Sequence, residues 1–277
     1  MTVELPYWDD FFARLADRPD SVTRVLERHA HWGLFADPQA TGITDDVFLA
    51  AAEAMTERIC GSANMKNGQQ ILDVGCGLGG TLSYNNDRLT HCELVGLNID
   101  ARQIAAARER VTARPTNTVT FVVGDACALP FEDGAFDRVL AVECIFHFPS
   151  RRTFLSEARR VLKPGGRLTF SDFIVNSTKF DEMTDWMEAN PTAQGTFYGA
   201  MTPAISSNSY ERLGRTKNLK LVADEDVTAN TMPTYQWLES AYGRTGPAEA
   251  VKTAKFLEEL ARRGFFQYRI LSFEATT

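Results

Sequence analysis

The sequence of 277 residues lacks several features that mark specialised classes of protein. No apolar run approaches the roughly 18 residues that a membrane-spanning helix needs, and the stretch MTVELPYWDDFF carries acids where a signal peptide carries a basic region. The 5 cysteines stand singly, without the CxxC pairs that zinc sites use. We therefore expect a cytoplasmic protein with reduced thiols and no bound metal.

Clustered cations are also missing. The formal net charge is -7, and in the most basic stretch, residues 105–114 (AAARERVTAR), Glu109 interrupts the arginines as on a solvated helix face. Because neutralising phosphates takes clustered Lys and Arg, we expect no nucleic-acid partner. The hydrophobic fraction of 44% and the charged fraction of 23% are those of an ordinary globular protein.

The order of apolar patterns indicates an α/β protein. Up to about residue 60, apolar residues recur three and four apart, as in helices, and Thr44 is a plausible N-cap. From Gln70 on, short apolar runs alternate with helical stretches, as in parallel strands joined by crossover helices. The expected strands are 70–74, 92–98, 119–123, 136–142, 167–173, 219–227 and 266–275. They predict a Rossmann-like, doubly wound and mainly parallel sheet with an antiparallel last strand, whose ligand crevice lies at the carboxyl ends of the strands.

Two segments fall outside this alternation. Residues 1–66 are expected to form an amino-terminal helical cap before a main domain at 67–277, and residues 176–203 are expected to form a lid inserted over the crevice. Both segments are rich in aromatic residues, which could roof an apolar ligand or merely pack the cap against the core. The residues in question are the aromatic Tyr7, Trp8, Phe11, Trp32, Trp186, Phe197 and Tyr198, together with Met201.

The strongest local motif is ILDVGCGLGG at 71–80, a strand that runs directly into glycines. Gly75, Gly77 and Gly79 allow a sharp turn and a close approach of the backbone to a ligand, before a helix that presents free N–H groups. The turn alone could cradle the pyrophosphate of NAD or FAD. Asp73 would repel a pyrophosphate but suits the ammonium and sulfonium of S-adenosylmethionine (SAM). We expect these four residues to hold the methionine part of SAM.

A second motif, GDA at 124–126, closes the third expected strand. Asp125 can accept a hydrogen bond from the exocyclic amine of adenine, while the backbone N–H of Ala126 serves a ring nitrogen. Alternatively, Asp125 is only a turn residue at the end of a strand. A third motif, RVLKPGGRL at 160–168, predicts a helix end and a tight turn, and carries no chemistry.

In order and spacing, these motifs closely resemble the class I SAM-dependent methyltransferases. The resembling group includes the ubiquinone and menaquinone biosynthesis C-methyltransferases, tocopherol methyltransferases and many natural-product methyltransferases. It often carries an acid for the ribose hydroxyls at the end of the second strand, where this sequence has Asn98. The resemblance implies that Asn98 and Gln103 contact the ribose and that SAM is the cofactor.

The segment ECIFHFP at 143–149 follows the fourth expected strand and should lie at the crevice mouth. His147 is the candidate general base, needed only if the acceptor must lose a proton, and Asp172 could orient its ring. Similar His/Asp pairs are suspected in related sugar and polyketide methyltransferases, although a lone histidine is more often structural. His29 and His31, beside Trp32, are candidate substrate contacts.

The sequence therefore predicts methyl transfer from SAM to a small, bulky and largely apolar acceptor, with O- or C-methylation of a natural product favoured. Two alternatives remain. One is a nicotinamide-dependent oxidoreductase, which Asp73 disfavours, and the other is a SAM-binding protein without turnover. A homo-oligomer is also compatible with the aromatic amino terminus.

Overall fold

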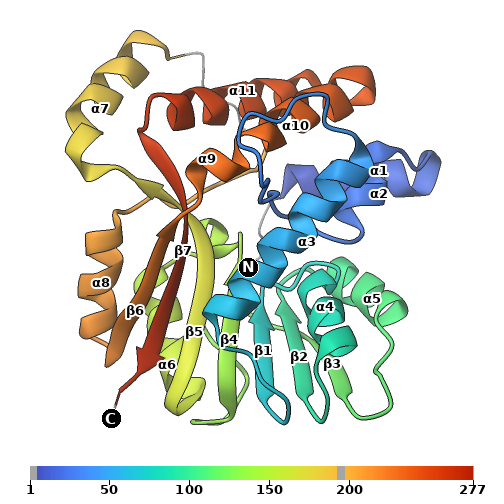
Figure 1. Ribbon diagram of the computed structural model, residues 1–277, viewed down its shortest axis with the longest axis vertical. Helices are drawn as coiled ribbons and strands as arrows, with labels where there is room; N and C mark the ends of the chain where they lie inside the picture. The colour runs from blue at the N-terminus through green and yellow to red at the C-terminus, as the bar shows by residue number, and fades with distance from the viewer. Residues whose placement is uncertain (1–4, 192–196, 277) are drawn as a thin grey trace.

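The computed structural model describes residues 5–191 and 197–276, and a sheet of seven strands in the order β3-β2-β1-β4-β5-β7-β6 forms its centre (Figure 1). The neighbours from β3 to β5 pair in parallel, whereas β7 is antiparallel to both β5 and β6. The predicted Rossmann-like fold is thus confirmed. The strands are β1 (Gln70–Val74), β2 (Glu93–Asn98), β3 (Thr118–Val123), β4 (Phe136–Val142), β5 (Leu162–Val175), β6 (Leu219–Asp226) and β7 (Phe266–Ala275).

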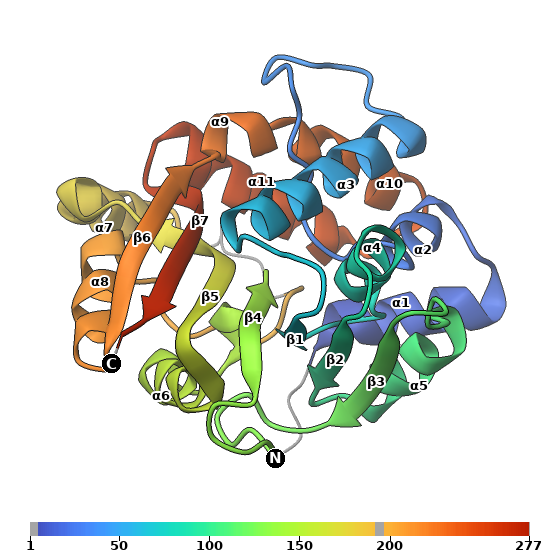
Figure 2. The same cartoon turned by 60° about the horizontal axis from the view of Figure 1, so that its bottom comes forward.

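Helices cover both faces of this sheet. Figure 2 shows α6 beside β5 and α8 beside β6 on one side, with α3 on the other, where it contacts β5 and β7. The remaining helices near the sheet follow β1 and β2. These elements are α3 (Asp45–Ser62), α4 (Gly80–Arg88), α5 (Ala101–Arg110), α6 (Arg151–Val161) and α8 (Ser207–Arg215). The hydroxyl of Thr44 caps α3 by accepting a hydrogen bond from the Val47 N–H at 3.3 Å, as predicted.

A second layer of helices gathers above the carboxyl end of β5, and hence above the same end of the strands parallel to it (Figure 1). It combines the amino-terminal segment with the carboxyl-terminal part of the chain. For example, Phe48 of α3 stacks on Trp237 of α10 with ring centroids 4.2 Å apart. The layer consists of α1 (Pro6–Asp17), α2 (Ser21–Leu26), α7 (Phe180–Ala189), α9 (Thr228–Thr231), α10 (Pro233–Thr245) and α11 (Ala248–Arg262).

Several aromatic residues of the expected cap and lid are buried in the fold. Trp8, Phe11, Trp32 and Phe197 are all buried. Trp32 lies edge-on to Phe173 with ring centroids 4.8 Å apart, so the cap packs directly on the sheet. Part of the expected lid, residues 192–196, lies outside the described residues.

The largest difference from the expected strand boundaries is in β5; those of β2, β3 and β6 differ by one residue. The strand predicted to begin at residue 167 begins at Leu162, which pairs with Phe136 before a register shift to the pair Arg138–Arg167. The KPGG turn is therefore an irregularity within β5, where Gly165 takes a φ of 74°. In the part of the chain that the structure describes, no helix is both long and apolar enough to cross a membrane.

The contact between Gly80 at the start of α4 and the backbone of the cap at Arg28 can be tested by substitution. A Cβ at Gly80 would lie 1.8 Å from the backbone oxygen of Arg28, whereas one at Gly61, inside α3, would meet nothing within 4 Å. We expect Gly80→Ala to lower the free energy of unfolding by about 1–3 kcal/mol through overpacking. The control Gly61→Ala should raise it by about 0.5–1 kcal/mol because alanine is the better helix former. Urea unfolding that finds Gly80→Ala as stable as Gly61→Ala would show that this contact is not tight.

Candidate functional site

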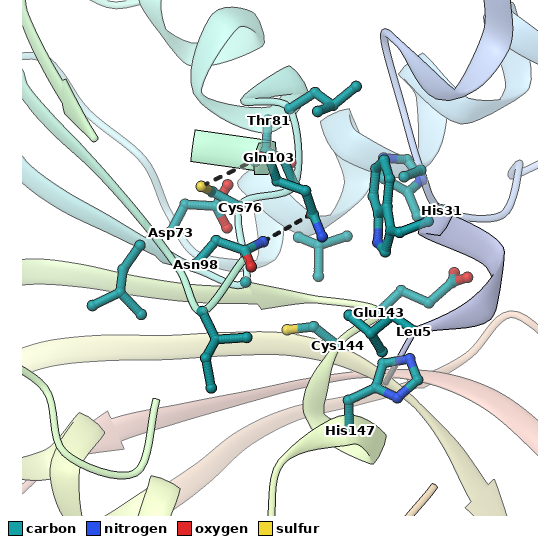
Figure 3. A pocket seen from close by; sticks show the side chains of 18 of the residues that line it. Leu5, His31, Asp73, Cys76, Thr81, Asn98, Gln103, Glu143, Cys144 and His147 are labelled. Carbon is teal, nitrogen blue, oxygen red and sulfur yellow. Dashed lines mark hydrogen bonds between the residues drawn. The ribbon is translucent and has the colours of Figure 1, made fainter. Parts of the chain in front are cut away.

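A cavity at the carboxyl ends of β1, β2, β3 and β4 brings together most of the residues singled out in the sequence (Figure 3). It is roofed by the amino-terminal segment, from which Leu5, Tyr7 and Trp8 line it. We call it the cofactor cavity. The expected site residues that line it are Asp73, Gly75, Gly77, Asn98, Gln103, Asp125, Ala126 and His147.

Asp73, the last residue but one of β1, has a buried side chain without a hydrogen-bond partner among the described residues. The residue is 1% exposed, and neither carboxylate oxygen has a hydrogen-bond partner among the described residues. Burial raises the pKa of Asp73 to about 8, since nothing nearby compensates the charge. A buried carboxyl group of this kind fits a ligand that brings its own positive charge, as SAM does, and does not fit a pyrophosphate.

The three glycines of the turn have different roles. Gly75, Gly77 and Gly79 have φ values of 74°, 54° and 84°, so all three adopt the left-handed conformation. A Cβ at Gly75 would lie 2.6 Å from the sulfur of Cys144, while the space beside Gly77 is open to 3.8 Å. Gly79 is not among the residues that line the cavity, and a Cβ there would lie 2.9 Å from the Phe121 ring.

Asn98 and Gln103 form a buried pair of amides at the end of β2. The Asn98 Nδ2 donates to Gln103 Oε1 at 3.0 Å, and the Asn98 Oδ1 accepts from the backbone N–H of Asp100 at 3.0 Å. Each amide nitrogen carries two hydrogens, so each keeps a donor beyond its contact within this group. The pair can therefore donate to hydroxyl groups in the cavity.

Asp125 is a turn residue and is also available to a ligand. Its Oδ1 accepts from the backbone N–H of Cys127 at 2.7 Å, which fixes the turn after β3. The side chain lines the cavity, and Oδ2 has no such role in the turn. Both interpretations of the GDA motif are thus compatible with the structure.

His147 lies in a short 3₁₀ turn, η1 (Ile145–His147), after β4. Its Nδ1 lies 3.3 Å from the carbonyl oxygen of Ala200, and its Nε2 lies 3.5 Å from the hydroxyl of Tyr7. Because a carbonyl oxygen only accepts, the proton of the neutral ring is on Nδ1 and the lone pair is on Nε2. Burial lowers the pKa of His147 to about 4, so the ring is neutral at pH 7 and can accept a proton.

The expected contact between Asp172 and His147 is wrong. The Asp172 carboxylate is fully buried and accepts hydrogen bonds from Arg151 at 3.3 Å, from the Tyr210 hydroxyl, and from its neighbour's backbone N–H. It lines neither cavity. Burial raises its pKa, while the Arg151 guanidinium opposes that rise. The ring of His147 is instead held by a backbone carbonyl.

His29 and His31 line the cofactor cavity but are engaged in the cap. His31 contacts the Trp32 carbonyl oxygen at 3.0 Å and the Thr56 hydroxyl at 2.9 Å, and His29 contacts the Glu53 carboxylate at 2.8 Å. Burial lowers the pKa of both histidines. These contacts favour a structural role.

Glu143 is a site residue that the sequence did not single out. It has a φ of 49°, rare for a non-glycine residue, and its Oε2 accepts from the Trp32 N–H at 2.9 Å and the Tyr268 hydroxyl at 2.6 Å. Burial raises its pKa to about 8. The available signal was a carboxylate directly after the strand expected at 136–142.

A second cavity of about 540 Å³ adjoins the first, and we call it the acceptor cavity. The two share a wall that includes Tyr7, Glu143 and His147. The acceptor cavity is lined mainly by aromatic, aliphatic and methionine side chains from α1, β5, the segment 197–204, α7, α10 and α11. Representative residues are Trp32, Phe146, Phe173, Met183, Tyr198, Trp237 and Leu257.

Comparisons of the sequence and of the fold with known proteins all find methyltransferases. Residues 72–170 match the family model described as a methyltransferase domain. The chain is 29% identical over 273 residues to Methyltransferase GfsG of Streptomyces halstedii, covering 93% of this chain and 94% of that protein. It is 33% identical over 187 residues to an O-methyltransferase of Pyrenophora dematioidea, and this match covers 66% of this chain and 68% of that protein. The fold is the same as that of geranyl diphosphate C-methyltransferase from Streptomyces coelicolor A3(2), whose crystal structure contains Mg2+, geranyl diphosphate and S-adenosyl-L-homocysteine. The TM-score is 0.71, the sequence identity is 19%, and the alignment covers 100% of both chains.

The state of Asp73 has a consequence for binding that calorimetry can measure. With a pKa of about 8, Asp73 is mostly protonated at pH 7 in the free protein, whereas a cationic ligand favours the ionised form. Binding of SAM at pH 7 should therefore release about one proton, visible as a dependence of the binding heat on the ionisation enthalpy of the buffer. Asp73→Asn should bind more weakly and release none, and NAD should not bind. Wild-type binding without proton release would contradict this assignment.

Asp125 can be tested in the same way. If Oδ2 accepts from the adenine amine, Asp125→Ala should weaken SAM binding by about 1–3 kcal/mol, the cost of leaving that donor unpaired. Asp125→Asn is the matched control, because its side-chain oxygen can still accept from the Cys127 N–H and preserve the turn. Unchanged affinity in folded Asp125→Ala would show that the residue serves only the turn.

Proposed function

The chain belongs to the class I SAM-dependent methyltransferases, and we propose that it methylates a bulky, largely apolar natural product at an oxygen, with His147 accepting the proton. The observation that carries this proposal is the shared wall between the two cavities. His147 and Tyr7 lie on that wall, which is where a cofactor and an acceptor would meet. Transfer of a methyl group from SAM to a small molecule is the activity of the family.

Residues at three strand ends are suited to hold the cofactor. Asp73 and the open backbone at Gly77 would hold the methionine part, Asn98 and Gln103 the ribose, and Asp125 with Ala126 the adenine. When bound, SAM supplies a methyl group that its sulfonium already activates. The contribution of the protein is then mainly to position the acceptor and to exclude water.

The lining of the acceptor cavity supports the choice of acceptor. Its surface is largely hydrophobic, and the ionisable groups on it are few, among them Glu143, His147 and Arg151. Such a cavity binds an apolar scaffold and orients it through a small number of polar groups. The acidic chain, with a net charge of -7, further favours a small molecule over a nucleic acid.

The cap and lid have a place in this proposal. The described parts of the cap at residues 1–66 and of the insertion at 176–203 would close the acceptor cavity over the domain expected at 67–277. Tyr7 and Trp32 from the cap, and Tyr198 and Met201 from the insertion, line that cavity. Their burial of the acceptor would keep water away from the transferred methyl group.

The state of His147 supports an oxygen acceptor. A hydroxyl group must lose its proton during transfer, and the lone pair on Nε2 of the neutral ring, on the wall that the two cavities share, can take it. With a pKa of about 4, His147 holds this base form at every pH above about 5. An electron-rich carbon could be methylated before it loses a proton, so that reaction would depend on His147 much less.

His147→Asn separates these two reactions. With the true acceptor, we expect single-turnover rates to fall about a hundredfold with little change in SAM affinity. At saturating SAM, the wild-type rate should show no titration of His147 between about pH 6 and 9, because His147 loses its base form only as the pH approaches its pKa of about 4. The exposed His91 provides the control His91→Asn, since asparagine tolerates its φ of 61°. A rate in His147→Asn within about threefold of wild type would refute His147 as the base.

A further inference from the structure

Residues 200–203 form an irregular segment between α7 and α8 that is fixed from two sides. On one side, the Thr202 backbone N–H donates to the carbonyl oxygen of Phe146 at 2.7 Å, and the Thr202 hydroxyl donates to the same oxygen at 3.1 Å. On the other side, Arg151 Nη1 donates to the Thr202 hydroxyl and to the carbonyl oxygen of Pro203 at 3.0 Å. Thr202 thus links the segment by hydrogen bonds both to the 3₁₀ turn η1 and to α6.

This segment also carries the oxygen that holds the His147 ring. Ala200, two residues before Thr202, accepts from His147 Nδ1, and Phe146, which accepts from Thr202, directly precedes His147. The 3₁₀ turn and the segment therefore contact each other twice, once through the backbone and once through the imidazole. A displacement of Thr202 would move the Ala200 carbonyl away from the ring.

Arg151 in turn depends on Asp172. The two side chains are 6% and 0% exposed and lie 3.3 Å apart. The Tyr210 hydroxyl donates to Asp172 and accepts from Arg151 Nε at 2.7 Å, which completes a closed buried group. A buried guanidinium needs such a partner, because an unpaired charge in the interior is strongly destabilising.

We propose that the Asp172–Arg151 pair positions the His147 imidazole indirectly, by fixing residues 200–203 so that the Ala200 carbonyl holds the Nδ1–H form of the ring. Asp172 and Thr202 are then positioning residues for the reaction, although neither contacts His147. The lone pair of Nε2 is directed toward Tyr7 as a consequence. The importance of this arrangement for catalysis rests on the proposed function, but the arrangement itself can be measured without an acceptor.

Thr202→Val is the informative variant, because valine keeps the shape of threonine and removes the hydroxyl that links Arg151 to Phe146. Thr202→Ser is its matched control, since serine keeps that hydroxyl. The chain has 4 histidines, so protein labelled with nitrogen-15 in its imidazoles gives a small set of signals, and His147→Asn identifies those of His147. Their nitrogen shifts report which ring nitrogen is protonated.

In wild type and in Thr202→Ser, we expect the Nδ1–H form of His147 to dominate. In Thr202→Val, the ratio of the Nδ1–H to the Nε2–H form should fall by about tenfold, the factor that corresponds to one hydrogen bond of ordinary strength. Turnover should fall with it, mainly in kcat, while SAM affinity stays the same. Thermal unfolding with and without S-adenosylhomocysteine verifies that each variant is folded.

A folded Thr202→Val protein that keeps the wild-type ratio would overturn the proposal, as would a Thr202→Ser protein that shares the defect of the valine variant. A failure of the proposed function has a different signature. In that case the His147 signals would shift in Thr202→Val as expected, while His147→Asn itself retained turnover.

Discussion

A buried carboxyl group that has no hydrogen-bond partner among the described residues lies in the wall of the cofactor cavity. Asp73 is 1% exposed, and no described residue donates a hydrogen bond to it. An ionised carboxylate in such a place costs several kcal/mol, so the free protein avoids that cost by keeping the group protonated at neutral pH. A cationic ligand removes the need for the proton. We therefore expect this buried acid, and not the glycine turn, to give a preference for SAM over a dinucleotide, because both kinds of ligand can use the turn.

The acceptor cavity depends on a different constraint, the convergence of segments far apart in the sequence. The cap supplies Tyr7, whose ring stacks on His147 with centroids 5.8 Å apart. The backbone of the cap is tied to the carboxyl-terminal helices, because the Phe35 N–H donates to the Asn230 carbonyl oxygen at 2.8 Å. Cap, insertion and carboxyl-terminal helices thus form one layer over the sheet, and the strand-end turn with His147 lies beneath it.

The sequence predicted the parts of this structure that depend on local pattern. The bounds of β1, β4 and β7 are those expected, because apolar runs bordered by turn residues define them. The partners of Asp172 could not be predicted, since Arg151 and Tyr210 reach it only through the packing of α6 and α8 on the sheet. The Ala200 carbonyl oxygen that orients His147 could not be predicted either, because every residue has a backbone carbonyl and the residue type does not show which one contacts the ring.

The role of Asp73 can be isolated by comparing two ligands that share the adenosine and the sulfur. S-adenosylhomocysteine carries the amino acid part with its ammonium, and 5′-methylthioadenosine lacks it. In wild type, calorimetric titration should find S-adenosylhomocysteine bound about 100-fold more tightly or better, as expected for a charged group in a buried site. In Asp73→Asn, that difference should shrink by at least about tenfold, since the amide cannot compensate the ammonium charge. An equal difference in both proteins would contradict the claim that Asp73 receives the positive charge of the cofactor.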